Sequence, residues 1–404
     1  MGSEAHCPLA EARRRLLGLL PARAVEQIPL AAATGRVLAE PALSALAVPP
    51  QDCAAMDGYA VRAADTAGAG PHRPSRLSLL AGDLTAGRAQ VPPVAPGQTV
   101  RIMTGAPLPA GADAVVPWER AREEAGGLLF GEPVVPGSHV RRRGQELRPG
   151  AVCFPAGRFL TAFEVGLLAS AGCATVSAWA RPRVAVLATG SELRDLAEPA
   201  APGREVVASN GYMLAAQVAE WGGLPDRRPP VGDDPEALVR AVRSAEAPVV
   251  VTTAGTGRGV HDFLTAVWAA LRAEVVVPGV AIRPGSTTRV ARLGERILLG
   301  LPGGPGAAWA AFHALVGPAL WAWGGVAAEP LAVRAALAEV VSTEAGVTHL
   351  IRGRLMPAGE GWRFAPARTG ATGVAILEGT DREIAAGAVV RVELLPPRPA
   401  PGTE

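Results

Sequence analysis

Two aspartates lie close together in a segment that is unsuited to regular structure. Residues 49–61 begin with two prolines and carry Asp52 and Asp57 among small residues. Gly58 follows Asp57 directly, so the backbone there can turn tightly or approach a ligand closely. An acid on such a constrained turn can coordinate a metal ion or position a substrate. The alternative is an Asx-type turn, in which Asp57 bonds only its own backbone.

A second stretch, residues 101–119, reads RIMTGAPLPAGADAVVPWE. Thr104 opens a glycine turn whose hydroxyl and amide groups could meet a phosphate or another oxyanion. In an ordinary turn, Thr104 would instead bond its own backbone. The residues alone leave both interpretations open.

Further acids occupy positions where loops are expected: Glu192, Asp233, Asp234 and Asp262. Each of them alone could cap a helix, and Asp233 is the favoured cap because Pro235 could occupy a first turn. Their joint occurrence favours a site that holds a divalent metal ion. His261 has no histidine partner and is interpreted as a surface or packing residue.

Three units of strand, glycine-rich loop and helix begin at residue 183. The expected strands are 183–188, 247–253 and 296–300; the loops read TGSEL, AGTGRG and LPGGPG; the helices span 210–221, begin at Asp262, and span 307–316. Such units imply a doubly wound parallel sheet, which binds ligands beyond the carboxyl ends of its strands. Glycines there let backbone N–H groups close on phosphates. The sequence therefore predicts a phosphorylated ligand.

The remaining segments predict two β-rich regions and a few helices. Residues 77–152 and the tail after Pro330 consist of short apolar runs separated by Gly and Pro, and the tail is expected to form a small barrel or sandwich. Helices are expected at 9–20 and within 159–172. Residues 306–328 are nearly all apolar, but Gly317-Pro318 interrupts them, which favours a buried helix ending at Gly317 over a membrane span.

Composition limits the classes of function. The chain has 404 residues, 49% of them hydrophobic, which is enough for two to four domains. The net charge of +2 indicates neither a nucleic-acid surface nor a membrane-binding tail. All of the Lys+Arg positions are arginine, because lysine is absent. The N-terminus does not resemble a signal peptide. The cysteines form no CxxC pair, so neither a zinc site nor a disulfide framework is expected and a reducing cytosol fits: Cys7, Cys53, Cys153 and Cys173.

Two stretches have amino-acid sequences that are specific to one protein family. MDGYA (56–60) and TGAPLPAGADAVV (104–116) resemble signatures of molybdopterin molybdenumtransferases of the MoeA type, whose relatives include the gephyrin E domain. The resemblance extends over essentially the whole chain. It implies an elongated α/β multidomain fold with a scaffold domain (1–48 and 147–178), an inserted β-rich domain (49–146), a doubly wound, MogA-like molybdopterin-binding domain (179–327) and a β-barrel-like domain (328–404).

This resemblance also implies a function. Such an enzyme inserts molybdate into adenylylated molybdopterin, releases AMP and forms molybdenum cofactor. It would use Mg²⁺, act in the cytoplasm as a homodimer with its site between subunits, and meet the molybdopterin adenylyltransferase and apo-molybdoenzymes; no nucleic acid or membrane is expected as a partner.

Motif matching assigns residues to these roles. Those implied to be catalytic are Asp57, Thr104, Glu192, Asp262 and Arg283, with Asp57, Glu192 and Asp262 holding the metal. Those implied to bind the pterin cofactor are Glu146, Thr189, Gly190, Ser191, Asp233, Gly255, Gly257, Gly259, Pro302, Gly303, Pro305 and Arg352.

Several loops depart from the family pattern. GGVSVGDYD becomes AGTGRGVHDF (254–263), KPGKP becomes RPGST (283–287), GLPGNP becomes GLPGGP (300–305), and Gln145 replaces the first residue of an acidic pair. These departures concentrate in the presumed ligand crevice. An alternative is therefore a catalytically weakened paralogue that binds molybdopterin as carrier, scaffold or regulator. A dinucleotide oxidoreductase is disfavoured, because the spacing of Gly255, Gly257 and Gly259 is not GxGxxG.

Overall fold

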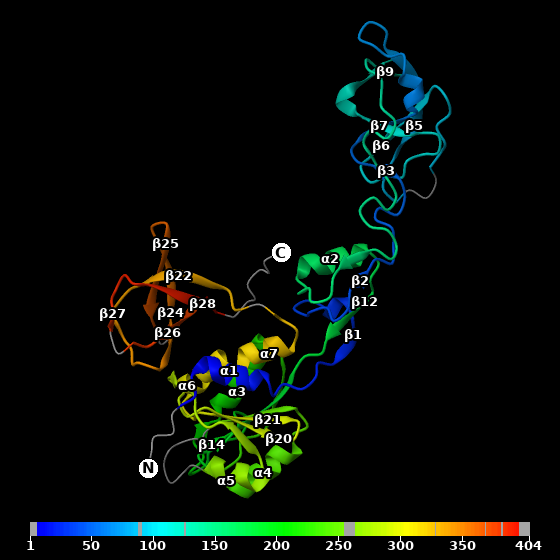
Figure 1. The fold of residues 1–404 in the computed structure, drawn as a ribbon. Helices are drawn as coiled ribbons and strands as arrows, with labels where there is room; N and C mark the ends of the chain where they lie inside the picture. The colour runs from blue at the N-terminus through cyan, green and yellow to red at the C-terminus, as the bar shows by residue number, and fades with distance from the viewer. Residues whose placement is uncertain are drawn as a thin grey trace. The chain divides into compact units, whose positions relative to one another are not determined.

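The structure is a computed structural model that describes residues 6–87, 91–124, 127–253, 263–327, 329–367, 369–380 and 383–395. Contacts divide the chain into two units (Figure 1). The first comprises Met1–Glu26, Gly35–Ala39 and Ala178–Glu404, and the second Gln27–Thr34 and Glu40–Ser177. The division into four domains stays a prediction.

A six-stranded sheet in the order β16-β13-β17-β21-β20-β18 lies at the centre of the first unit. Its members are β13 (Arg183–Ala188), β16 (Leu224–Arg227), β17 (Val249–Thr253), β18 (Glu274–Val277), β20 (Arg289–Leu293) and β21 (Arg296–Leu301). Strands β16, β13, β17 and β21 are parallel, whereas β20 is antiparallel to both of its neighbours. The three strands predicted from the sequence, β13, β17 and β21, are parallel as expected, and the unpredicted strands β20 and β18 add antiparallel pairings at one edge. Only two residues join β20 to β21, a connection that permits a hairpin but no parallel crossover.

Helices cover both faces of this sheet (Figure 1). Successive β13 side chains point to opposite faces: Val184 and Val186 pack in the core with α1, α3, α6 and α7, and Ala185 and Leu187 pack in the core with α4 and α5. The doubly wound arrangement is confirmed. The helices are α1 (Leu9–Leu17), α3 (Ser209–Glu220), α4 (Pro235–Ser244), α5 (Phe263–Leu271), α6 (Pro305–Ala311) and α7 (Gly317–Trp323).

The expected helix end at Gly317 is wrong. The chain continues from α6 through a π-helical turn, η4 (Phe312–Val316), into α7. Pro318 lies in the first turn of α7 and cannot donate to the turn before it, but the Ala314 carbonyl four residues earlier accepts a hydrogen bond from Arg13 Nε at 2.7 Å. A Cβ at Gly317 would lie 2.3 Å from the Trp221 ring, so this glycine permits close packing and does not end the helix. No helix within the described residues is long and apolar enough to cross a membrane.

Helix α4 was not expected from periodicity. Its N-cap corrects the prediction that Asp233 caps a helix. Asp234, with a backbone of extended conformation, accepts a hydrogen bond from the Glu236 N–H at 2.9 Å, and Pro235 follows it in the first turn. The capping residue is therefore Asp234 and not Asp233, which leaves the Asp233 side chain for other partners.

The C-terminal strands close into a five-stranded barrel through the neighbours β22-β25-β24-β26-β28-β22. Phe364, Val392 and Leu337 fill its core. The barrel expected for the tail is confirmed. Its strands are β22 (Ala332–Leu337), β24 (Thr348–Ala358), β25 (Gly361–Pro366), β26 (Gly373–Glu378) and β28 (Val389–Leu394); β19 (Ile282–Arg283) adds to β24, and β23 (Val341–Ser342) pairs with β27 (Glu383–Ile384).

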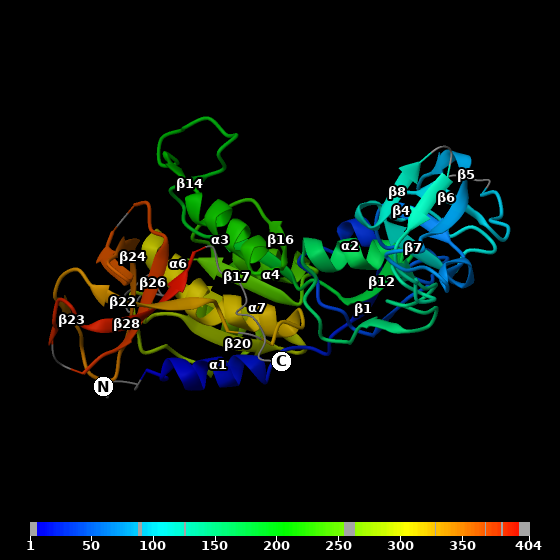
Figure 2. The same cartoon turned by 90° about the horizontal axis from the view of Figure 1, so that it is seen from above.

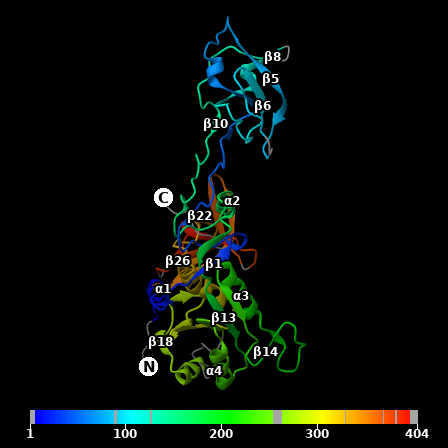
Figure 3. The same ribbon diagram turned by 90° about the vertical axis from the view of Figure 1, so that its right-hand side faces the viewer.

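The second unit contains a six-stranded sheet in the order β7-β4-β6-β5-β9-β8. Strands β5, β6 and β8 of this sheet are labelled in Figure 3. Its strands are β4 (Gly58–Val61), β5 (Ser75–Leu84), β6 (Gln98–Ile102), β7 (Ala114–Pro117), β8 (Ala121–Glu124) and β9 (Gly127–Phe130). Helix α2 (Ala162–Ser170) begins with a capping box formed by Thr161 and Glu164. Short pairs complete the fold: β1 (Val25–Pro29) with β12 (Thr175–Trp179), β2 (Ala42–Leu43) with β11 (Val152–Phe154), and β3 (Cys53–Ala54) with β10 (Val140–Arg141).

Gly58 of the MDGYA stretch is required by a close approach between two strands. A Cβ at Gly58 would lie 2.0 Å from the Val116 carbonyl oxygen of β7, and the backbone has no positive φ. The sequence expectation of a tight turn or an approach to a ligand is therefore corrected.

We expect Gly58→Ala to lower the free energy of unfolding by about 2 kcal/mol, because β7 must move away from β4. Urea unfolding measures this loss. Gly131→Ala is the matched control, since nothing lies within 4 Å of its Cβ position, and we expect it to change stability by at most about 0.5 kcal/mol. Equal midpoints for the two variants would contradict the strand-contact explanation.

Candidate functional site

Asp57 and Thr104 meet at the ends of two paired strands. Asp57 immediately precedes β4, Thr104 comes two residues after β6, and Gly58 pairs with Ile102. The backbone N–H and the hydroxyl of Thr104 both donate to Asp57 Oδ1 at 2.7 Å. These two bonds, the backbone one first, lower the pKa of Asp57.

This contact replaces the turn interpretations of both residues. Asp57 bonds neither its own backbone nor, through Oδ2, any other described residue. The N–H and hydroxyl of Thr104 donate to Asp57, so they neither bond the backbone of Thr104 itself nor are free to bind an oxyanion. Thr104 therefore orients an exposed, ionised carboxylate.

The arginine run 141–143 is engaged with acids. Arg141 pairs with Glu146, and Arg142 Nη1 donates to Asp52 Oδ2 at 2.7 Å. The Arg143 N–H, followed by the Arg142 guanidinium, lowers the pKa of Asp52. Exposed ion pairs of this kind contribute at most about 1 kcal/mol, so Glu146 can exchange Arg141 for a ligand at little cost.

The loop after β13 folds back on itself. The Thr189 hydroxyl donates to the Thr253 carbonyl, and the Gly190 N–H donates to the Val231 carbonyl at 2.9 Å. Gly190 has φ 151°, and a Cβ there would lie 2.7–2.9 Å from the Glu192 carboxylate. The positive φ favours glycine at position 190, and the Glu192 carboxylate that lies over it receives no hydrogen bond from the described residues.

Ser191 and Asp233 form a reciprocal pair. The Ser191 N–H donates to Asp233 Oδ2 at 3.1 Å, and the Asp233 N–H donates to Ser191 Oγ at 2.9 Å. The pair connects the loop after β13 with the loop that leads into α4. The structure thus brings four of the predicted residues together at one end of β13: Gly190, Ser191, Glu192 and Asp233.

Asn210, at the start of α3, was not singled out from the sequence as a site residue. Its Nδ2 donates to the Gly303 carbonyl at 2.7 Å and so holds the loop between Pro302 and Pro305. Its Oδ1 is buried and has no partner among the described residues. The available signal was a polar amide at the first turn of a helix beside a glycine-rich loop.

Two predicted cations lie on neighbouring strands. Arg283 of β19 pairs in register with His349 of β24. Arg352 lies three residues after His349 on the same strand. Arg283 Nη1 donates to Glu344 at 3.1 Å. The Arg352 guanidinium lies 4.7 Å from the centroid of the Trp309 ring. Because successive side chains of a strand point to opposite faces, Arg283 shares a face with His349, whereas Arg352 points to the other face of β24.

A further cluster missed from the sequence lies at the base of an arm between β14 (Leu193–Arg194) and β15 (Val206–Val207) (Figure 2). Asp195 accepts hydrogen bonds from Arg227 Nη1 at 2.5 Å and from the Tyr212 hydroxyl at 2.7 Å. Arg227, followed by Tyr212, lowers the pKa of Asp195 to about 2. The ion pair anchors the arm near the loop that carries Glu192.

Some predicted residues lie outside the part of the chain that the structure describes: Gly255, Gly257, Gly259, His261 and Asp262. Within the described ranges, no group of three or more His, Cys, Asp or Glu side chains could hold a metal ion.

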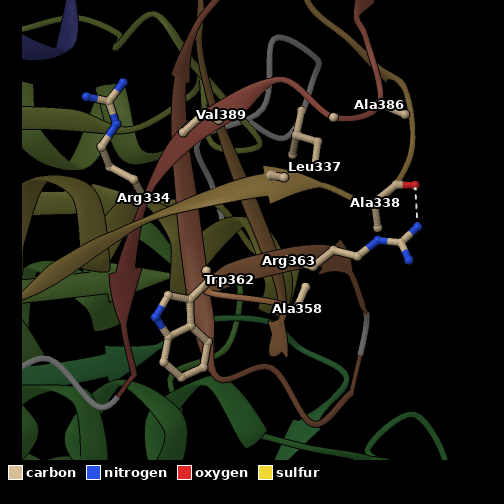
Figure 4. Close-up of a pocket in the computed structure, with 11 residues that line it drawn as sticks. Arg334, Leu337, Ala338, Ala358, Trp362, Arg363, Ala386 and Val389 are labelled. Atoms are coloured by element: carbon tan, nitrogen blue, oxygen red, sulfur yellow. Dashed lines mark hydrogen bonds between the residues drawn. The ribbon is translucent and has the colours of Figure 1, made fainter.

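A hollow of about 640 Å³ on the barrel lies apart from the predicted residues (Figure 4). Trp362, Arg334 and Arg363 line it together with small and aliphatic side chains. None of the predicted site residues contributes to it.

The chain is similar to known proteins over most of its length. Residues 7–172 match the model of the MoeA N-terminal region (domain I and II), and residues 185–322 match the model described as "Probable molybdopterin binding domain". A molybdopterin molybdenumtransferase of Nostoc is 37% identical over 316 residues, which are 76% of this chain and 72% of the relative. One of Staphylococcus aureus is 30% identical over 372 residues, which are 91% and 88%.

The chain belongs to the molybdopterin molybdenumtransferase family. Two crystal structures of the MoeA protein from Pyrococcus horikoshii match it with TM-scores of 0.81 and 0.77, at 30% and 26% identity. Each match covers 96% of this chain and at least 99% of the other. The fold class and the family inferred from MDGYA and TGAPLPAGADAVV are both confirmed.

Proposed function

We propose that this protein is a molybdopterin molybdenumtransferase that takes adenylylated molybdopterin and molybdate, releases AMP and forms molybdenum cofactor. The observation that carries the proposal is the gathering of Gly190, Ser191, Glu192 and Asp233 at the carboxyl end of β13. Ligands of doubly wound sheets bind at this edge. The family relationship supplies the identity of the ligand.

The side chains divide into two chemical roles. Arg283 and Arg352, with the backbone N–H groups of the glycine loops, would bind the phosphate groups and molybdate. Glu192 would supply negative charge at the reacting centre, and Asp57 from the other chain of the homodimer inferred below would add to it, as the site between subunits in this family implies. Thr104 and Ser191 would orient these regions, through Asp57 and Asp233 respectively. Glu146 would bind the pterin after leaving Arg141.

The acids of the described chain suit Mg²⁺. This ion is commonly held by one or two carboxylates together with substrate phosphates, so a preformed cluster of three acids is not needed. The Glu192 carboxylate and Asp57 Oδ2, both without hydrogen bonds from described residues, are oxygen donors of the right kind. Bound Mg²⁺ would neutralise charge on the adenylyl phosphates.

We also infer a homodimer that acts in the cytoplasm and requires neither nucleic acid nor a membrane. Phe163 and Leu167 of α2 are 72% and 39% exposed, an apolar surface that a second copy could cover. Light scattering at micromolar concentration checks the mass; a monomer would contradict the inference.

A reconstitution tests the proposed function. Purified protein is mixed with adenylylated molybdopterin, molybdate and Mg²⁺, and AMP release and activation of an apo-molybdoenzyme are followed. We expect AMP release to require molybdate, to cease with EDTA and to return with excess Mg²⁺. Tight pterin binding without AMP release would instead support a carrier, scaffold or regulator, and absence of binding would refute both functions.

A further inference from the structure

Four side chains from different elements form a connected column. The Arg352 guanidinium carbon lies 4.7 Å from the centroid of the Trp309 ring. The Trp309 ring stacks on the His313 imidazole, with centroids 5.0 Å apart and planes at 14°. His313 Nε2 lies 3.1 Å from Glu393 Oε2. We refer to Arg352, Trp309, His313 and Glu393 as the aromatic column.

The elements fix the orientation of the Trp309 ring. Trp309 of α6 and His313 of η4 are four residues apart, so their side chains lie on one helical face. Gln217 Nε2 of α3 donates to the Trp309 carbonyl at 3.2 Å, and Trp221 meets the His313 ring edge-on, with centroids 5.3 Å apart. His313 is 1% exposed. Trp309 therefore has little freedom to turn.

Arg352 has an unused donor at the end of this column. Its Nε is buried and has no hydrogen-bond partner among the described residues. The indole face attracts the cation above it, but this contact does not satisfy an N–H group that lies in the guanidinium plane. Arg283 differs, because one of its N–H groups already binds Glu344. Arg352 is thus held in place while its Nε–H remains available to a ligand.

We propose that Trp309 is a positioning residue that holds Arg352 to bind a tetrahedral oxyanion near the loop preceding α6. Trp309 lies one helical turn after Pro305, and Asn210 fixes the Gly303 carbonyl of the same loop. The oxyanion is either a phosphate group of the ligand or molybdate, which share charge and shape. This inference deepens the proposed function and rests on it for the identity of the anion.

Titration calorimetry with inorganic phosphate and, separately, with molybdate tests the proposal. For one or both anions, we expect Trp309→Leu to weaken binding about tenfold, which corresponds to about 1.4 kcal/mol. Trp309→Phe, which keeps an aromatic face, should stay within about threefold of the unaltered protein. Trp362→Leu is the matched control, because Trp362 lines the separate hollow on the barrel, and should change nothing.

A double-mutant cycle separates positioning from a general loss of structure. In an Arg352→Ala background, Trp309→Leu should have no further effect on binding, because Trp309 acts through Arg352. An additional tenfold loss there would overturn the proposal, as would wild-type affinity in Trp309→Leu alone. Absence of phosphate and molybdate binding to the unaltered protein would also overturn it. If only one anion responds, that anion is the occupant.

The same experiments distinguish the two proposals. A protein that binds the anion through Trp309 and Arg352 but releases no AMP would refute the proposed function and leave this inference standing. A protein that releases AMP while Trp309→Leu binds both anions normally would refute this inference alone. Should Trp309→Leu fail to fold, Trp309→Met, which also removes the aromatic face but keeps a long apolar side chain, replaces it in these measurements.

Discussion

Asp57→Asn should reduce molybdate-dependent AMP release by about 100- to 1000-fold, the loss typical when one preorganised electrostatic group is removed from an active site. Asparagine keeps the shape of the side chain, and its Oδ1 can still accept the N–H and O–H of Thr104. Only the negative charge is lost. Initial rates of AMP release measure the effect, and urea unfolding should show an unchanged midpoint.

The control for this variant is in the same segment. Asp52 is an acid five residues earlier that binds Arg142 and the Arg143 N–H, and it is not a predicted site residue. Asp52→Asn should stay within about threefold of the unaltered rate, since it breaks only an exposed ion pair. If Asp57→Asn releases AMP at the rate of Asp52→Asn, the Asp57 charge takes no part in the reaction.

Local sequence predicted three of the six strands of the α/β sheet, β13, β17 and β21, because their signal is local, and missed β16, β18 and β20. Residues 184–188 are a continuous apolar run that follows Arg183, and β13 has the predicted bounds, Arg183–Ala188. The helix end at Gly317 failed for the same reason. A Gly-Pro pair normally interrupts a helix, but this pair is accommodated by the π-helical turn η4 and by Trp221, which packs against Gly317 from a distant part of the chain.

In the candidate site too, some features could be predicted from the sequence and others could not. Family motifs indicated Asp57 and Thr104 separately, but their hydrogen bond joins residues 47 positions apart through the β4–β6 pairing. Asn210 and Trp309 carry no motif of their own. Their importance comes from the Gly303 carbonyl and the Arg352 guanidinium, which only the folded chain brings to them. Spacing alone could therefore suggest residue types for the site but not their partners.

Glu393→Ala should lower the free energy of unfolding by about 3–4 kcal/mol, measured by urea unfolding at pH 7. Glu393 is 3% exposed on β28, and its carboxylate binds His313 Nε2 and, at 2.7 Å, Arg391 Nη1. The ionised carboxylate can only accept, so Nε2 carries the proton between them. Removal of the carboxylate leaves this buried N–H unpaired. Glu360→Ala, at an exposed position, should change stability by at most about 0.5 kcal/mol.

The stability that Glu393 contributes should also depend on pH. Burial alone would raise the pKa of Glu393, but the hydrogen bond and charge of His313, followed by those of Arg391, lower it below its ordinary value of 4.5. A carboxyl group with a lowered folded-state pKa stabilises the protein fully above the unfolded-state pKa and loses that stabilisation as the pH falls through the folded-state pKa. The difference in unfolding free energy between the unaltered protein and Glu393→Gln should therefore shrink as the pH falls below about 4.5. A difference that grows on acidification would show that His313 and Arg391 do not hold Glu393 ionised, and the aromatic column would lose its charged end.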